Sequence, residues 1–246
     1  MIQIDNLFVK YDNLNILEDI NLQMAEGSVC AVIGPSGCGK STLLNILAGI
    51  NHDYEGKVFI NGMKPSPKKQ TIGFIPQNYG LLPWLKVKDN IMIGLNIKHK
   101  NNSQIPMDLI DSLGLNKLLN RYPKELSGGQ QQRVSLARAF ALKADLLLMD
   151  EPFSALDAIT REEMQDVFIN LWQQQNVTTV LVTHYVEEAL YLGQKIVVMT
   201  ATPGKVYKII DNPLFADKNF RDREEFVQLS KQLRIYLKNA GRENEA

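Results

Sequence analysis

The chain has 246 residues, of which 45 % are hydrophobic and 22 % are charged, and 27 acidic residues balance 27 Lys and Arg residues. This composition is typical of a globular protein with roughly one or two domains. A formal net charge of zero gives no support to bulk electrostatic attraction to nucleic acid or to an anionic membrane. No apolar run approaches the roughly 18 residues of a spanning helix.

The N-terminus lacks the basic and apolar regions of a signal peptide. The two cysteines, Cys30 and Cys38, lie in an apolar run and in a glycine-rich segment, and neither looks like half of a structural disulfide. We therefore expect a reducing, cytosolic location.

Residues 1–24 alternate apolar and polar side chains, which predicts antiparallel strands with one covered face. Tyr11 falls between two of these runs, at an expected loop. An aromatic residue at such a position is either a half-buried surface side chain or a platform on which a base stacks. The residues alone leave these two readings open.

The apolar run Val29–Ile33 predicts a buried strand, and residues 43–47 continue at helical spacing. Between them the chain fits the phosphate-loop pattern G-x-x-x-x-G-K-[ST] with Gly34, Pro35, Ser36, Gly37, Cys38, Gly39, Lys40, Ser41 and Thr42. Strand, glycine loop and helix together predict a nucleotide triphosphate site, because loop amides and the helix dipole favour anions. Lys40 is the candidate ligand of the β- and γ-phosphates and Ser41 the candidate Mg²⁺ ligand. The loop environment also predicts a lowered pKa for Cys38, alkylation of which would block ATP binding.

Residues 56–62 and 71–75 are predicted as short strands, the first closed by an Asn-Gly turn. Helical periodicity then dominates residues 78–126, with a core predicted from Met107, Ile110, Leu113 and Leu118. The apolar cluster Leu81–Leu85 contains Trp84, which either caps this small helical core or forms a docking surface for a partner.

The segment Leu126–Arg133 predicts a helix that begins with Ser127 as its cap, followed by Gly128, Gly129 and Gln130. Two glycines in a first turn destabilise a helix by about 1 kcal/mol each, so they need another role. Exposed amides and a serine hydroxyl at a helix start make a second anion site.

The strand predicted at residues 146–149 ends in Asp150 and Glu151, two carboxylates that are costly there unless they meet a cation. A further strand, Val177–Val182, is predicted to end just before His184.

Near the C-terminus, Asp222 and Glu225 have capping-box spacing and precede a predicted helix with one apolar face.

Together these motifs, in this order, resemble the nucleotide-binding subunit of ATP-binding cassette (ABC) transporters. The resemblance rests on the phosphate loop 34–42, Gln77 of the glutamine loop, LSGGQ at 126–130, Asp150-Glu151, SALD at 154–157 and His184. It implies an α/β phosphate-loop fold with a mainly parallel sheet, an N-terminal antiparallel β subdomain and an inserted helical subdomain at about 78–140. The ATPase domain would span residues 1–210, and residues 211–246 would form a helical extension.

The resemblance also implies a role for each motif residue. Tyr11 would stack on adenine, Lys40 and the 37–42 amides would hold the phosphates, and Ser41, Gln77 and Asp150 would serve Mg²⁺. Glu151 would polarise the attacking water and His184 would contact the γ-phosphate. Ser127 and Gly129 of a second copy would close the site, and Asp157 would link the two sites of the dimer.

Softer signals resemble importers of nitrate, sulfonates and taurine: Leu82-Pro83-Trp84, the Ala201–Lys205 turn, and Phe220–Arg223. The expected partners are a separate permease, a second copy of the chain and, indirectly, an extracytoplasmic substrate-binding protein, with no nucleic acid. The expected place is the cytoplasmic face of the membrane. A soluble ABC ATPase acting on DNA or ribosomes is the alternative; it is disfavoured by the single cassette and by the lack of sustained heptads between Lys40 and Asp150.

Overall fold

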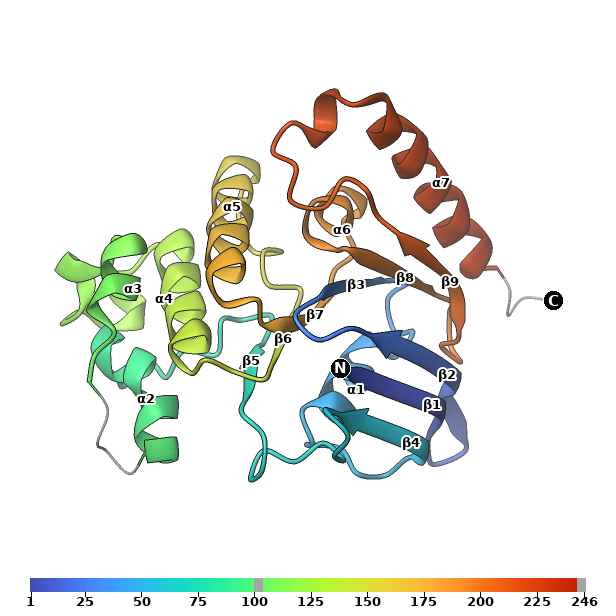
Figure 1. The fold of residues 1–246 in the computed structure, drawn as a ribbon, viewed down its shortest axis with the longest axis horizontal. Coiled ribbons are helices and arrows are strands. Elements are labelled where there is room, and N and C mark those ends of the chain that lie inside the picture. Colours follow the sequence, from blue (N-terminus) through green and yellow to red (C-terminus); the bar gives the residue numbers. More distant parts are fainter. Residues whose placement is uncertain (100–103, 243–246) are drawn as a thin grey trace. The chain divides into compact units, whose positions relative to one another are not determined.

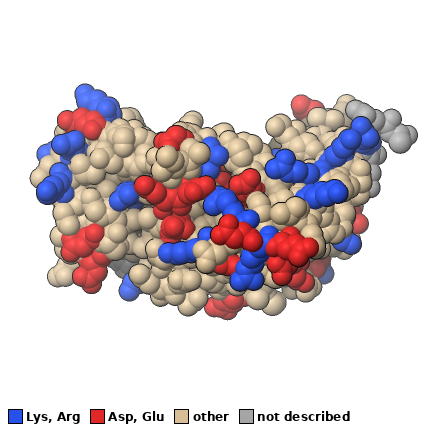
Figure 2. Space-filling view, turned by 90° about the horizontal axis from the view of Figure 1, so that it is seen from above, with Lys and Arg blue, Asp and Glu red and all other residues tan. Residues whose placement is uncertain are grey.

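The computed structural model describes residues 1–99 and 104–242 (Figure 1). The chain divides into two units, the first made of Met1–Gln70, Leu148–Asp150 and Thr178–Ala246, the second of Thr71–Leu147 and Glu151–Val177. A polar loop expected at Asn101–Ser103 lies outside the described residues. On the face seen in Figure 2, acidic and basic side chains are interspersed, as a net charge of zero suggests.

The first unit contains a three-stranded antiparallel sheet in the order β2-β1-β4. Its strands are β1 (Ile2–Tyr11), β2 (Leu14–Met24) and β4 (Glu55–Ile60). Ile2 pairs with Met24 on one side and with Ile60 on the other, and all three side chains are buried. The alternating pattern of residues 1–24 therefore does cover one face, as predicted.

The second sheet of this unit is mainly parallel. β3 (Val29–Ile33) pairs in parallel with β7 (Thr178–Val182) and β8 (Lys195–Met199), and β9 (Val206–Asp211) is antiparallel to β8. All five residues of β3 are buried, which fits a central strand covered on both faces. The helices of this unit are α1 (Lys40–Leu47), α6 (Val186–Leu192) and α7 (Glu224–Ala240), and α7 packs on α6, β8 and β9 (Figure 1).

β6 (Leu146–Asp150) belongs to both units. Leu148–Asp150 are assigned to the first unit, and the two residues before them to the second, which also contains β5 (Ile72–Ile75). In the strand order β6 is the neighbour of β5 and of β7. The predicted fold class, α/β with a mainly parallel sheet and an antiparallel β subdomain, is confirmed. The predicted domain boundaries stay predictions.

Helices build the rest of the second unit: α2 (Val87–His99), α3 (Met107–Ser112), α4 (Gly128–Ala141) and α5 (Ala158–Gln175). Two short 3-10 helices, Asn116–Leu118 and Pro123–Glu125, join α3 to α4. α4 packs against α2, α3, α5 and β5. Ile110 and Leu113 are buried as predicted, but Met107 is 46 % exposed. Met107 is the first residue of a six-residue helix, so its side chain precedes the turn that reaches the core.

The C-terminal helix exists, but its predicted capping box is wrong. A 3-10 helix takes Phe220–Asp222, Arg223 flanks α7 without a side-chain cap, and α7 starts at Glu224. Leu233 of the predicted apolar face is fully buried. In the part of the chain that the structure describes, every helix is too short or too polar to cross a bilayer.

Candidate nucleotide-binding site

The phosphate loop connects β3 to α1 in the first unit, and its shape requires glycine at two positions. Gly37 and Gly39 have φ angles of 79° and 91°, in the left-handed region that side chains disfavour. A Cβ on Gly39 would also lie 2.5 Å from Cδ2 of Leu17. α1 begins directly afterwards at Lys40 and carries no acidic residue in its first turn, so its positive end is not neutralised there.

Lys40 folds back across this loop. Its Nζ donates to the carbonyl oxygens of Gly34 at 2.9 Å and Pro35 at 2.7 Å, and lies 3.6 Å from Sγ of Cys38. The side chain is only 8 % exposed, and among the described residues no carboxylate forms a salt bridge with it. A buried ammonium held by two carbonyls and a thiol fits an anionic phosphate, which supplies the missing counter-charge.

The prediction of a lowered pKa for Cys38 is wrong. Its side chain is fully buried, and this burial raises the pKa of the thiol, although the Lys40 ammonium acts in the opposite direction. The turn at Ala201–Lys205 packs against the backbone of the same loop. The hydroxyl of Thr202 donates to the carbonyl of Gly37 at 2.9 Å, and a Cβ on Gly204 would lie 2.0 Å from the carbonyl oxygen of Cys38.

Three more predicted residues belong to the first unit. Tyr11 ends β1 with 45 % of its surface exposed, and its hydroxyl accepts a 2.8 Å hydrogen bond from Nδ2 of Asn51. Asp150 is the last residue of β6 and is half-buried. His184 is exposed in the connection between β7 and α6, where its ring lies 4.0 Å from that of Tyr185. The roles assigned to these side chains stay predictions.

Gln77 and Glu151 meet within the second unit. Nε2 of Gln77 donates to Oε2 of Glu151 at 3.1 Å, although 74 positions separate the two residues. Glu151 has a φ of 47°, which is uncommon for a residue with a side chain and costs of order 1–3 kcal/mol. The hydroxyl of Ser154 donates to the Glu151 carbonyl at 2.9 Å and helps hold this conformation.

Ser127 caps α4 as predicted. Its Oγ accepts from the amide of Gln130 at 3.4 Å, and Oε1 of Gln130 accepts from the amide of Ser127 at 3.1 Å. A Cβ on Gly129 would lie 2.7 Å from Cγ2 of Thr160, so the close approach of α5 also requires this glycine. Ser127, Gly129 and Gln130 border a hollow of about 330 Å³ in this unit. Gly128 is exposed beside them.

Asp157 caps α5, since its Oδ1 accepts from the amide of Thr160 at 3.1 Å. That bond stabilises the carboxylate and lowers its pKa.

The loop after Gln77 is joined to α4, the helix that begins in LSGGQ, by a residue that the sequence analysis did not single out. Arg138 donates to the carbonyls of Gly80 at 2.6 Å and Tyr79 at 2.8 Å. Arg138 is half-buried, and the signal that could have revealed it is an arginine within the otherwise apolar stretch after LSGGQ.

Asn90 is the second residue that the sequence analysis missed. Its side chain is fully buried and bonds to Leu82, Leu85 and Lys86, which fixes the loop before α2. The same loop leaves Trp84 69 % exposed. This exposure contradicts the reading in which Trp84 caps a helical core.

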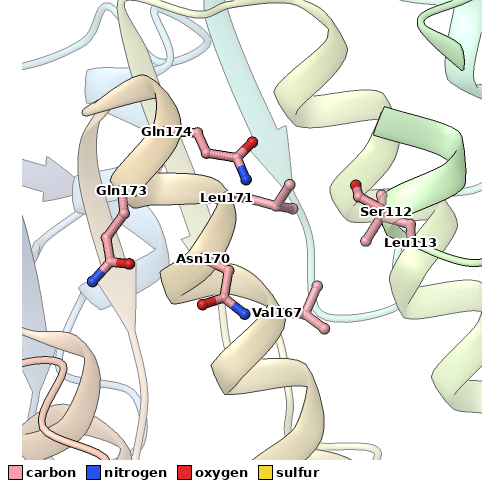
Figure 3. A pocket seen from close by; sticks show the side chains of 7 residues that line it. All are labelled: Ser112, Leu113, Val167, Asn170, Leu171, Gln173 and Gln174. Atoms are coloured by element: carbon pink, nitrogen blue, oxygen red, sulfur yellow. The ribbon is translucent and has the colours of Figure 1, made fainter. Parts of the chain in front are cut away.

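Another hollow of about 410 Å³ lies between α3 and α5 (Figure 3). Its lining combines apolar side chains with exposed amides and a hydroxyl: Ser112, Leu113, Val167, Asn170, Leu171, Gln173 and Gln174. These residues differ from the predicted site residues, so the hollow does not belong to the candidate site.

Comparison with known proteins agrees with this geometry. The family model described as ABC transporter matches residues 17–154. The chain is 43 % identical over 220 residues to the aliphatic sulfonates import ATP-binding protein SsuB of Bacillus cereus, covering 89 % of this chain and 87 % of the relative. It is 42 % identical to the taurine import ATP-binding protein TauB of Escherichia coli, covering 84 % and 82 %.

A solved dimer of the ATP-binding cassette MJ0796, in a post-hydrolysis state with ADP and phosphate, superposes with a TM-score of 0.76. It is 30 % identical, and the match covers 86 % of this chain and 98 % of that one. The resemblance drawn from the motifs is therefore confirmed, and the chain belongs to the ABC transporter family.

Proposed function

We propose that this chain is the ATP-hydrolysing subunit of an importer that takes up a small anion, such as an organic sulfonate, taurine or nitrate, through a separate permease. The observation that carries the proposal is the 42–43 % identity, over more than four fifths of both chains, to import proteins for aliphatic sulfonates and taurine. The phosphate loop, with its buried and unneutralised Lys40, supplies the chemistry that such a subunit needs.

In the proposed site, the phosphates of ATP displace the Lys40 ammonium from the Gly34 and Pro35 carbonyls and bind the amides of residues 37–42. Phosphoryl transfer depends mainly on positioning and charge neutralisation, which this cradle provides. The exposed ring of Tyr11 offers a face on which adenine stacks.

The metal chemistry fits the same residues. Mg²⁺ prefers oxygen ligands and keeps several waters, and Ser41, Gln77 and Asp150 offer a hydroxyl, an amide and a carboxylate oxygen. When bound, the ion would neutralise charge that develops on the phosphates. Glu151 would accept a proton from the attacking water, and Gln77 already orients its carboxylate. His184 would contact the γ-phosphate.

The proposed working form contains two copies of the chain. The signature residues Ser127 and Gly129 would bind the nucleotide held by the phosphate loop of the other copy, and Asp157 would link the two sites. The dimeric state of the related cassette with bound ADP and phosphate supports this arrangement. ATP that contacts both copies only in the closed dimer would stabilise that state by differential affinity.

The proposed permease contact is the Leu81–Leu85 cluster, because it presents an exposed Trp84 on a loop that Asn90 holds rigidly. Binding there would keep the subunit at the cytoplasmic face of the membrane. A substrate-binding protein on the opposite side would deliver the solute.

Reconstitution tests the proposal. The chain and its permease are inserted into proteoliposomes with ATP inside and the cognate substrate-binding protein outside, and uptake of labelled taurine, hexanesulfonate and nitrate is measured beside phosphate release. We expect ATP-dependent uptake of at least one solute, lost in Lys40→Ala. Phosphate release without uptake of any of the three would contradict the solute class, and purification with ribosomes or DNA instead of the permease would favour the soluble alternative.

A further inference from the structure

A groove of about 480 Å³ runs along α7 beside the start of α6, within the first unit. Its apolar wall comes from Phe226, Val227 and Ile235, of which Val227 is 63 % and Ile235 is 48 % exposed. Val227 and Ile235 project from other sides of α7 than Leu233, the buried centre of the helix, whereas Phe226 lies seven residues before Leu233 and therefore on nearly the same side. A volume of this size lies within the range of small-molecule sites.

Three cations border the same α7 groove: Lys231, Arg234 and Lys238. They recur at spacings of three and four, so they are neighbours on one face of the helix and repel one another. Among the described residues none of the three forms a salt bridge. Glu187 also lines the groove, but its carboxylate lies 3.5 Å from Nε of Arg221, so that charge is already paired.

A buried hydroxyl completes the groove. Ser230 lines it and is only 9 % exposed, and its Oγ has no hydrogen-bond partner within the described parts of the chain. Buried polar groups are nearly always hydrogen-bonded, so an unpartnered hydroxyl in a groove bordered by cations marks a place where a ligand acceptor is missing. The groove therefore combines an apolar wall, an excess of positive charge and a free donor.

We propose that the α7 groove binds a small amphiphilic organic anion, with an aliphatic chain that ends in a sulfonate or carboxylate. The chain would lie along Val227 and Ile235. The head group would accept hydrogen bonds from Arg234 and Lys231 and, after a small side-chain shift, from the hydroxyl of Ser230. The assignment rests on the groove's own side chains and holds for whichever solute the permease carries.

Calorimetric titration of the full chain with sodium hexanesulfonate and with sodium hexanoate tests the site. Sodium sulfate tests whether charge alone suffices, and hexyltrimethylammonium tests whether the apolar chain alone suffices. We expect both hexyl anions to bind and the other two probes to bind at least tenfold more weakly. The double variant Lys231→Gln/Arg234→Gln should bind hexanesulfonate about tenfold more weakly, and Ser230→Ala several-fold more weakly.

The matched control is Lys57→Gln, which removes an exposed lysine from β4 and should leave binding unchanged. ATP binding is measured on every sample, so a folded chain with an intact nucleotide site is established independently. Equal affinity for sulfate and hexanesulfonate, or no effect of Ile235→Ser, would overturn the amphiphile assignment. If the chain binds none of the four probes but sediments with phosphatidylglycerol vesicles, the proposed small-anion site is overturned in favour of a membrane-binding surface.

Discussion

Nε2 of Gln77 donates a hydrogen bond to Oε2 of Glu151, with 3.1 Å between the two atoms. The amide follows β5 and the carboxylate follows β6, so the segments after two strands contribute one side chain each. This bond holds one oxygen of the proposed general base. Gln77 lies at the start of the loop that bears the Leu81–Leu85 cluster, so the bond links Glu151 to that loop. Arg138 donates hydrogen bonds to the carbonyls of Tyr79 and Gly80 in the same loop.

Removal of the Gln77 amide should therefore slow hydrolysis more than it weakens nucleotide binding. Gln77→Ala leaves the Glu151 carboxylate without this donor, and we expect kcat to fall about tenfold or more while KM changes little, as for a misplaced general base. Steady-state phosphate release checks this. Gln173→Ala, at an exposed position of α5, is the control and should behave as wild type. An unchanged kcat in Gln77→Ala would remove the glutamine from the catalytic account.

Trp84→Asp should impair association with the permease and spare the fold. The side chain is 69 % exposed, so a charge there disturbs little of the core, whereas an apolar contact with a partner would be lost. A pull-down with the permease beside an ATP-binding measurement reads out both effects. The matched control is Trp172→Asp. Trp172 is 8 % exposed and its indole donates to the carbonyl of Val177, so this variant should unfold more readily instead. Normal association of Trp84→Asp would contradict the docking surface.

Cys38 should react slowly with iodoacetamide in the folded protein at pH 7. Burial raises the pKa of its thiol, so little thiolate is present, and the side chain is fully buried in the folded protein. Burial raises the pKa of Cys30 to about 12, so it serves as the internal reference for an inert buried thiol. Mass spectrometry after timed labelling, native and in urea, measures both. Complete native labelling of Cys38 within minutes would contradict the structure.

The Asp157 cap should make stability depend on pH in the acid range. Its folded-state pKa is lowered below the ordinary value of 3.8 by the bond from the Thr160 amide. The ionised cap therefore adds its full share to the free energy of unfolding at pH values above the ordinary pKa. That share is lost as the pH falls through the lowered, folded-state pKa. Asp157→Ala should lower the urea midpoint at pH 7 and lose the corresponding part of the acid-range slope. Asp157→Asn should keep a cap but lose the slope. Identical slopes in all three proteins would contradict the assignment.

The sequence predicted those features that local chemistry dictates. The glycine loop, the strand before it and the Ser127 cap depend on neighbours in the chain, and each was found where the pattern indicated. Contacts between segments that are distant along the chain could not be predicted from the sequence. Burial of the Cys38 side chain raises the pKa of its thiol, opposite to the expected shift, and Arg138 and Asn90 fix loops through carbonyls that no motif marks. The pairing of Gln77 with Glu151 is of the same kind.

The measurement that tests the account most directly compares Glu151→Gln with Asp150→Asn. Both variants are analysed by size-exclusion chromatography with ATP and Mg²⁺, alongside phosphate release. Glu151→Gln keeps the phosphate loop and Asp150, so it should bind MgATP, hydrolyse it on the order of 10²-fold more slowly or worse, and elute as a dimer trapped by ATP. Asp150→Asn should bind Mg²⁺ weakly and stay monomeric. Hydrolysis by Glu151→Gln at the wild-type rate would contradict the central claim that this carboxylate activates the water.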